Sequence, residues 1–195
     1  MRDLVTSDAT AEEQTVGEQA GTGIADPVSV CRSGEGEAWW AMGSLFERLV
    51  GAEQTGGDLA AMVVSQPPGL ATPTHVHTRE SEAWFVLDGS VLYRAGDELV
   101  SLTAGDFIYL PRNIPHAFRV SGDRPVRYLA ISLPGALLDI YRDLGVPAAE
   151  RRLPDGGLAA ADVEAWNRLA PSYGLRVVGP PIPPGPPSAG GGPLP

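Results

Sequence analysis

Three histidines and one glutamate stand at spacings that can hold a metal ion. His75 and His77 are separated by a single residue. On an extended chain two such side chains point to the same face, because side-chain direction alternates with a period of two. A turn over 78–81 leads into the next predicted strand, where Glu82 can face the same space, and His116 supplies a third imidazole. Three neutral imidazoles and one carboxylate make a mixed site suited to one divalent ion of iron, nickel, manganese, cobalt, copper or zinc.

These residues also lie in two longer patterns. The segment from Gly69 to Gly89 resembles the first motif of the cupin family, G(X)5HXH(X)3-4E(X)6G, at every defined position. The segment from Gly105 to Val120 resembles the second motif, G(X)5PXG(X)2H(X)3N, but has Asn113 for the second glycine and Val120 for the final asparagine. Asn tolerates the left-handed backbone of a tight turn better than other residues with a side chain. Neither departure changes a ligand position.

The resemblance implies a fold, a ligand set and an assembly. The implied fold is all-β, a small cupin (jelly-roll) β-barrel with a short C-terminal helical appendage. The chain after Pro134 is similar to the tail of many single-domain cupins that resemble quercetin dioxygenase. The implied ligands of one divalent transition-metal ion are His75, His77, Glu82 and His116. Because single-domain cupins commonly pair through the outer sheet, the resemblance also implies a C2 homodimer.

The ligand set points to catalysis. Three histidines and one glutamate leave one or two positions open on a five- or six-coordinate ion, whereas a structural site is normally closed. The resemblance implies a dioxygenase, in which an enolic or phenolic hydroxyl of a small molecule such as a flavonol binds the ion and dioxygen attacks the activated carbon. Glu82 is then the candidate catalytic residue, as ligand, as the base that takes the hydroxyl proton, or as both.

Two other classes of function use the same residues. A non-redox cyclase or isomerase of natural-product (polyketide) biosynthesis would use the ion only as a Lewis acid that polarises a carbonyl. A small-molecule-binding cupin would hold its ligand without turnover, although the chain has no recognisable DNA-binding or signalling segment of the kind that sensing cupins often carry. Oxygen uptake, conversion without oxygen, and binding without turnover distinguish the three hypotheses.

Apolar residues that share the alternation of Glu82 or of His116 are candidates for a substrate pocket. They are Trp84, Val86, Phe118 and Val120. Ordinary packing inside the barrel explains the same four positions, so both interpretations stay open. Tyr93 and Tyr109 can face either side, because bulges at barrel rims reset the alternation. Glu80 stands too early for the motif and is predicted to be solvated.

The elements that position these residues are short strands separated by Gly, Pro and Asp, a pattern typical of a sandwich or barrel. The predicted strands are 38–42, 44–50, 58–65, 82–88, 90–95, 98–102, 106–110, 116–120 and 126–133. Helical spacing then predicts helices over 135–145 and 160–170, expected to pack on the outside of the barrel. A weak strand signal follows at 175–178.

Composition changes at both ends of the chain. Residues 1–26 lack a sustained hydrophobic period and predict a disordered acidic tail. Residues 179–195 are almost all Pro and Gly and predict a second disordered tail. The cupin domain between them is predicted to span 27–178, with the helical appendage at 134–178.

Charge and composition exclude several classes of function. The net charge of −10 argues against a nucleic-acid partner, and the absence of Lys excludes Schiff-base chemistry. Cys31 is the single cysteine, so neither an internal disulfide nor a thiolate cluster can form. No stretch approaches the roughly 20 apolar residues of a membrane helix, and the N-terminus lacks the features of a secretory signal. We therefore expect a cytoplasmic protein, with a small-molecule substrate and no membrane partner.

Overall fold

The computed structural model describes residues 28–184. The strands are β1 Ala38–Ala41, β2 Ser44–Val50, β3 Ala60–Gln66, β4 Thr74–His77, β5 Ser81–Asp88, β6 Ser90–Ala95, β7 Glu98–Thr103, β8 Phe107–Leu110, β9 His116–Val120, β10 Val126–Leu133, β11 Val146–Pro147 and β12 Leu175–Gly179. The helices are η1 Ala52–Gln54, η2 Gly135–Leu138, α1 Asp139–Leu144, α2 Ala160–Leu169 and η3 Ala170–Tyr173. None of these helices is long and apolar enough to cross a membrane.

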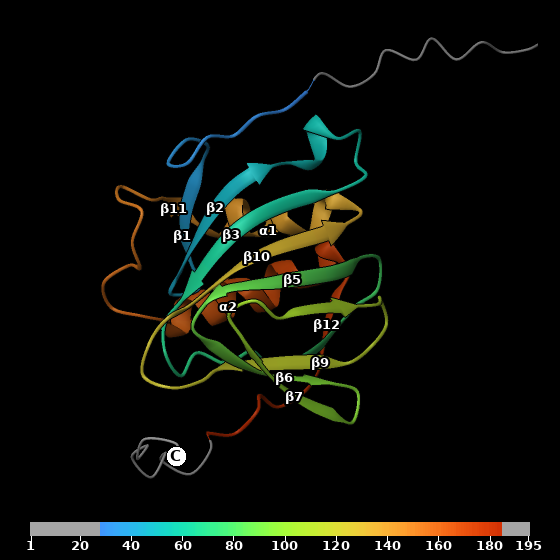
Figure 1. Cartoon of the computed structure of the whole chain (residues 1–195). Helices are drawn as coiled ribbons and strands as arrows, with labels where there is room; N and C mark the ends of the chain where they lie inside the picture. The colour runs from blue at the N-terminus through green and yellow to red at the C-terminus, as the bar shows by residue number, and fades with distance from the viewer. Residues whose placement is uncertain (1–27, 185–195) are drawn as a thin grey trace, which may run out of the picture.

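The strands form two antiparallel sheets (Figure 1). The seven-stranded sheet has the order β11-β1-β2-β3-β10-β5-β8, and the five-stranded sheet has the order β12-β4-β9-β6-β7. The predicted all-β fold with a C-terminal helical appendage is confirmed, and every predicted strand is present with ends that shift by at most two residues. The alternation that predicted the strands is visible as burial. Along β3, for example, every second side chain is buried.

The interior between the sheets is rich in aromatic side chains. Trp84 stacks on Tyr128 with ring centroids 3.8 Å apart and meets the edge of Tyr93 at 5.3 Å and of Phe118 at 4.9 Å. Such pairs stabilise a core by about 0.5–1.5 kcal/mol each beyond the burial of their area. The packed aromatic rings therefore give the strands that carry the motif residues a rigid support.

The helical appendage packs in a place that the sequence did not predict. Tyr141 of α1 stacks on the buried Phe46 of β2, with centroids 3.8 Å apart, and Trp166 of α2 lies against Tyr141 at 6.2 Å. Leu138 joins the main core. The expectation that these helices cover the outside of the barrel is wrong. Helical periodicity shows which side chains are buried but not which surface buries them, and here that surface is the inner face of the seven-stranded sheet, with the helices behind that sheet in Figure 1.

The end of the described chain pairs with the strand that carries two of the histidines. The strand signal at 175–178 corresponds to β12, which runs antiparallel to β4. After β12 the backbone stays close: Thr74 N–H donates to Pro180 O at 3.2 Å, and Arg119 Nε donates to the carbonyl of the buried Ile182 at 2.8 Å. The rest of the predicted C-terminal tail and the predicted acidic tail at 1–26 lie outside the described residues.

Candidate metal centre

The three histidines come from two paired strands. His75 and His77 lie on β4 with their side chains in the interior. His116 begins β9, and the antiparallel register places it directly opposite His75. Asn113 adopts the predicted left-handed conformation, with φ of 69°, and its N–H donates to the His77 carbonyl at 2.8 Å. This turn therefore ties the segment before His116 to the strand that carries the other two histidines.

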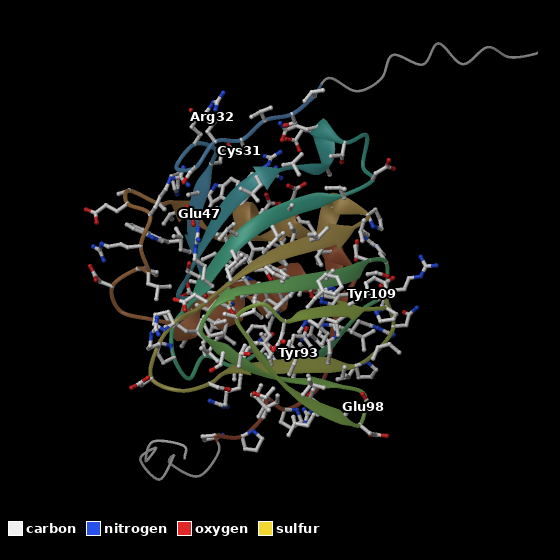
Figure 2. The ribbon with its side chains drawn as sticks, in the orientation of Figure 1. Cys31, Arg32, Glu47, Tyr93, Glu98 and Tyr109 are labelled. Atoms are coloured by element: carbon white, nitrogen blue, oxygen red, sulfur yellow. The ribbon has the colours of Figure 1, made fainter. Side chains whose placement is uncertain are left out.

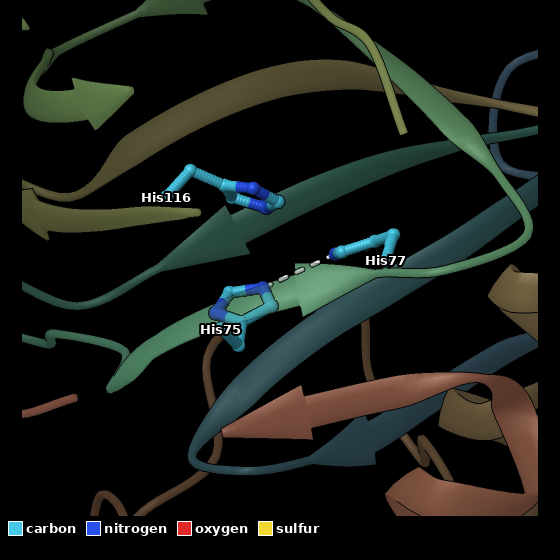
Figure 3. Close-up of side chains that lie close together, drawn as sticks. All are labelled: His75, His77 and His116. Carbon is cyan, nitrogen blue, oxygen red and sulfur yellow. Dashed lines mark hydrogen bonds between the residues drawn. The ribbon is translucent and has the colours of Figure 1, made fainter. Parts of the chain in front are cut away.

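The imidazoles converge on one point (Figure 3). One nitrogen from each ring can be chosen so that all three lie within 4.8 Å of one another. His75 Nε2 and His77 Nε2 are 3.1 Å apart. Two nitrogen ligands at about 2.1 Å from one ion, with angles of roughly 90–109°, stand about 3.0–3.4 Å apart. The spacing of this pair therefore fits two bonds to a single transition-metal ion.

Backbone carbonyls fix which nitrogen two of the rings present. Nδ1 of His75 lies 2.8 Å from Pro73 O, and Nδ1 of His116 lies 2.9 Å from Ile114 O. A carbonyl can only accept, so each Nδ1 carries the proton and each Nε2 keeps its lone pair. Nε2 of His116 is buried and has no hydrogen-bond partner among residues 28–184. A lone pair held in this way fits a metal bond, so the donor set suits a divalent transition-metal ion.

Burial keeps the rings neutral. Loss of solvent lowers the pKa of His75 to about 4, with the nearby His116 adding to the effect. Loss of solvent also lowers the pKa of His77 to about 2, with His75 and His116 adding to the effect, and burial lowers the pKa of His116. At neutral pH all three rings are therefore neutral, each with one nitrogen free of a proton, which is the form that binds a metal.

Glu82 lies in the same interior but outside the group of three. Its side chain is buried and lines a cavity of about 30 Å³ together with His75 and His77. Burial raises the pKa of Glu82 to about 7, and the nearby Trp84 indole opposes that rise. The indole Nε1 makes no well-formed hydrogen bond within the described chain. The carboxylate thus stands where it can meet an ion or a substrate held by the histidines.

The predicted pocket residues have two different environments. Trp84, Val86, Phe118 and Val120 are all buried, but only Trp84 and Phe118 line a cavity, whereas the two valines pack in the core. The two tyrosines left open by the sequence are now placed, as Figure 2 shows: Tyr93 is inside the fold and Tyr109 is on the surface. Tyr93 lines the same small cavity, and its buried hydroxyl has no hydrogen-bond partner in the described part of the chain.

One acidic residue lies in a different environment from the one predicted. Glu80 was expected to be solvated, but its side chain is only 3% exposed. It stands in the short connection between β4 and β5, where Glu80 is buried although the neighbouring Arg79 is exposed. Burial raises the pKa of Glu80, and the charge of Arg79 opposes the change. Glu80 does not line the cavity beside the histidines.

A larger cavity adjoins the cluster, and sequence reasoning missed most of it. It has a volume of about 240 Å³ and shares Thr72, His75, Phe118, Tyr141 and Trp166 with the smaller one. Its other walls include Phe46, Gln66 and Leu70, with Leu158 and Val163 from the C-terminal region. The helical periodicity of 135–145 and 160–170 was the only available signal, and it pointed to the wrong surface.

Comparisons with known proteins agree with the fold and the motif positions. Residues 62–132 match the family described as "Cupin domain". The chain is 29% identical over 116 residues to quercetin 2,3-dioxygenase of Bacillus subtilis, covering 60% of this chain and 34% of that protein. It is 30% identical over 146 residues to germin-like protein 5-1 of Oryza sativa subsp. japonica, covering 66% of this chain and 63% of that protein.

A solved structure supports the same fold. A protein from Thermotoga maritima, described as a predicted oxalate decarboxylase, superposes with a TM-score of 0.50 at 20% identity and covers 54% of this chain and 98% of that one. With the two motifs, the paired sheets and the histidine cluster, these matches show that the chain carries a cupin domain, which the family match places at residues 62–132. The chain spans less than two thirds of the length of each of the two curated relatives named above.

Proposed function

We propose that this cupin is a metal-dependent dioxygenase that acts on an enolic or phenolic small molecule such as a flavonol. The observation that carries the proposal is the convergence of three neutral imidazoles, one of which, His75, lines the larger apolar cavity. The ligands hold an ion, and the cavity offers a dry approach to it. The similarity to a quercetin 2,3-dioxygenase supports the reaction class.

Each residue then has a role at a stated atom. His75 and His116 present Nε2 to a divalent ion, and His77 completes the three-nitrogen set. When bound, the ion would hold the substrate oxygen, lower the pKa of its hydroxyl and activate the neighbouring carbon toward dioxygen. Glu82 takes the hydroxyl proton as the substrate enters, and its place on the wall of the small cavity puts it within reach of that hydroxyl.

The sizes of the two cavities indicate that they hold different parts of the substrate. The small cavity holds about 30 Å³, roughly the share of one water molecule in the liquid. It has room for reacting atoms but not for the body of a substrate. The body belongs in the larger cavity, where Phe46, Phe118 and Tyr141 exclude water from the reaction.

A second candidate function is a non-redox cyclase or isomerase. The observation in its favour is that Glu82 lies outside the group of three histidines. A carboxylate that is not bound to the ion is free to move protons between two positions of one substrate. In that reaction the ion polarises a carbonyl and no oxygen is consumed.

One experiment separates these functions from simple binding. Quercetin and other enols are mixed with the protein as purified, and oxygen uptake and product are recorded in air and under argon. A dioxygenase consumes oxygen in proportion to product and is inactive under argon. Equal conversion under argon supports the cyclase or isomerase, and binding without product supports a ligand-binding cupin. Elemental analysis of the same sample identifies the ion, and a redox-inert ion such as zinc would weigh against the dioxygenase.

A further inference from the structure

The larger cavity spans the gap between the two sheets. Gln66 ends β3 in the seven-stranded sheet, and His75 lies on β4 in the five-stranded sheet, yet both line the cavity. The walls between them are aromatic, with Phe46 and Phe118 from the strands and Trp166 from α2. A molecule in this space therefore meets one polar group from each sheet and flat apolar surfaces around its body.

Gln66 is the unusual residue in this wall. Its side chain is only 6% exposed, and its Oε1 has no hydrogen-bond partner within residues 28–184. A buried amide oxygen without a donor weakens the fold, since it has lost its hydrogen bonds to water and gained none in return. A polar group kept in this state at the wall of a cavity is placed to meet a ligand.

We propose that Gln66 selects the substrate by binding a hydroxyl group that is separate from the reacting one. The proposal rests on the proposed function, because the reacting hydroxyl is the one beside the histidines. The substrate class is a flat, ring-containing enol or phenol with a second hydroxyl on another part of its ring system. A hydroxyl both donates and accepts, so it satisfies the amide of Gln66 in either orientation.

The aromatic walls specify the body of this substrate. Phe46, Phe118, Tyr141 and Trp166 present rings to the cavity, and Leu158 and Val163 are partly exposed apolar residues of the same lining. Rings of a ligand pack well on such faces, whereas a sugar or a dicarboxylic acid would lose water without recovering its hydrogen bonds. Thr72, Tyr141 and Asn167 also line the cavity, but Gln66 is the lining residue whose side chain has a buried polar atom without a partner in the described part of the chain.

The alternative is that Gln66 is a structural residue whose amide is satisfied by water. The two interpretations differ in what they predict for a pair of matched ligands. Quercetin and 3-hydroxyflavone share the enolic hydroxyl and the neighbouring ketone, but only quercetin has hydroxyls on the outer rings. A structural Gln66 would not contribute to the preference between them.

The test is calorimetric titration of both ligands into the protein as purified, under argon so that no oxygen is consumed. The variants are Gln66→Met, which keeps the length of the side chain, and Gln66→Leu, which keeps the proposal testable if the first variant folds poorly. Gln54→Met is the matched control, because Gln54 is exposed and outside the cavity. Metal content and oxygen uptake are measured on the same samples.

We expect the wild-type protein and Gln54→Met to bind quercetin at least about 10-fold more tightly than 3-hydroxyflavone, as one hydrogen bond to a buried amide implies. Gln66→Met and Gln66→Leu should reduce this preference to within about threefold, by weakening quercetin alone. The proposal is overturned if the variants keep the preference, or if the wild-type protein binds neither ligand or both equally. If the wild-type protein prefers quercetin over 3-hydroxyflavone but contains no metal or consumes no oxygen, the proposed function is contradicted instead.

Discussion

The histidine cluster and the apolar cavity beside it are built in different ways. The cluster comes from two strands that pair directly, and its geometry follows from a period of two and one antiparallel register. The cavity draws on the turn after β1, the end of β3, both C-terminal helices and Pro181 after β12. The reactive groups are therefore set by local sequence, whereas the shape around them is set by packing between distant segments.

This difference separates the two tasks of the site. The histidines are held by the strand backbone and by the carbonyls of Pro73 and Ile114, independently of the helices. The cavity depends on contacts such as the stack of Tyr141 on Phe46. Changes in the helices should therefore alter ligand binding without releasing the metal, whereas changes in the cluster should release the metal.

The largest effect is expected from Glu82→Gln, which keeps the volume but removes the charge and most of the basicity. Turnover should fall by about 10²–10⁴-fold, the usual scale for a general base. Metal should remain, because the three histidines hold it without the carboxylate. Initial rates and elemental analysis of the same samples check both statements. Unchanged turnover would mean that Glu82 is not the general base.

A smaller effect is expected from Trp166→Ala, which removes an aromatic wall of the cavity. The affinity for quercetin should fall by about 10-fold, since aromatic contacts of this kind contribute on the order of 1 kcal/mol beyond their buried area. Metal content should not change. Trp40→Ala removes an indole that lines neither of the two adjoining cavities and serves as the control. If Trp166→Ala releases the metal, the two regions are not independent.

The pH dependence of the metal-free protein tests the environment of Glu82. Burial raises its pKa from 4.5 to about 7, so the folded state binds this proton more tightly than the unfolded state. The resulting stability is present below pH 4.5 and is lost as pH rises through 7, a change on the order of 3 kcal/mol. The histidines make the same contribution to the pH dependence of stability in Glu82→Gln and in the wild-type protein. Their contribution therefore cancels when the two proteins are compared.

Without metal, Glu82→Gln should therefore have a higher free energy of unfolding than the wild-type protein. This advantage should be larger at pH 8 than at pH 5. Saturation with metal should reduce or reverse the advantage at pH 8, because a nearby cation favours the ionised carboxylate. Urea titrations at the two pH values, with and without metal, measure this difference. An advantage that is the same at both pH values would mean that Glu82 is solvated in the folded protein.

The smallest effect on the site is expected from the outer face of the seven-stranded sheet. Phe107 and Tyr109 on the edge strand β8 are 59% and 53% exposed, and Phe85 lies opposite Phe107 on β5. An apolar edge of this kind favours a second copy of the chain, so we expect the C2 homodimer implied by the family resemblance. Phe107→Glu should give a monomer by light scattering, with metal content and turnover within about twofold of wild type. A wild-type monomer at micromolar concentration would contradict the expectation.

The sequence predicted what depends on local geometry. Strand alternation located nine of the ten strands between residues 38 and 133. The exception is β4, which was recognised only as an extended segment carrying His75 and His77. The left-handed turn at Asn113 was also predicted correctly. These features depend on the allowed backbone conformations and on a period of two, which a single sequence displays.

The sequence did not predict what depends on packing between distant segments. Gln66 ends a strand before two prolines, and nothing in that context distinguishes it from a surface amide. Its role depends on Trp166 and Tyr141, which lie far along the chain and were expected on the other side of the sheet. Glu80 was expected to be solvated for a similar reason, because the burial of a side chain in a short loop depends on how that loop packs on the rest of the fold.

The central claim is that three histidines hold one transition-metal ion, and elemental analysis of purified protein tests it most directly. The measurement covers the wild-type chain, His75→Ala, His77→Ala and His116→Ala, with Tyr109→Ala as a control on the surface. We predict one ion per chain in the wild type and the control, and less than about a tenth of an ion in each histidine variant, because Glu82 lies outside the group of three and does not take the place of the lost imidazole. Full metal content in His77→Ala or in His116→Ala would contradict the account.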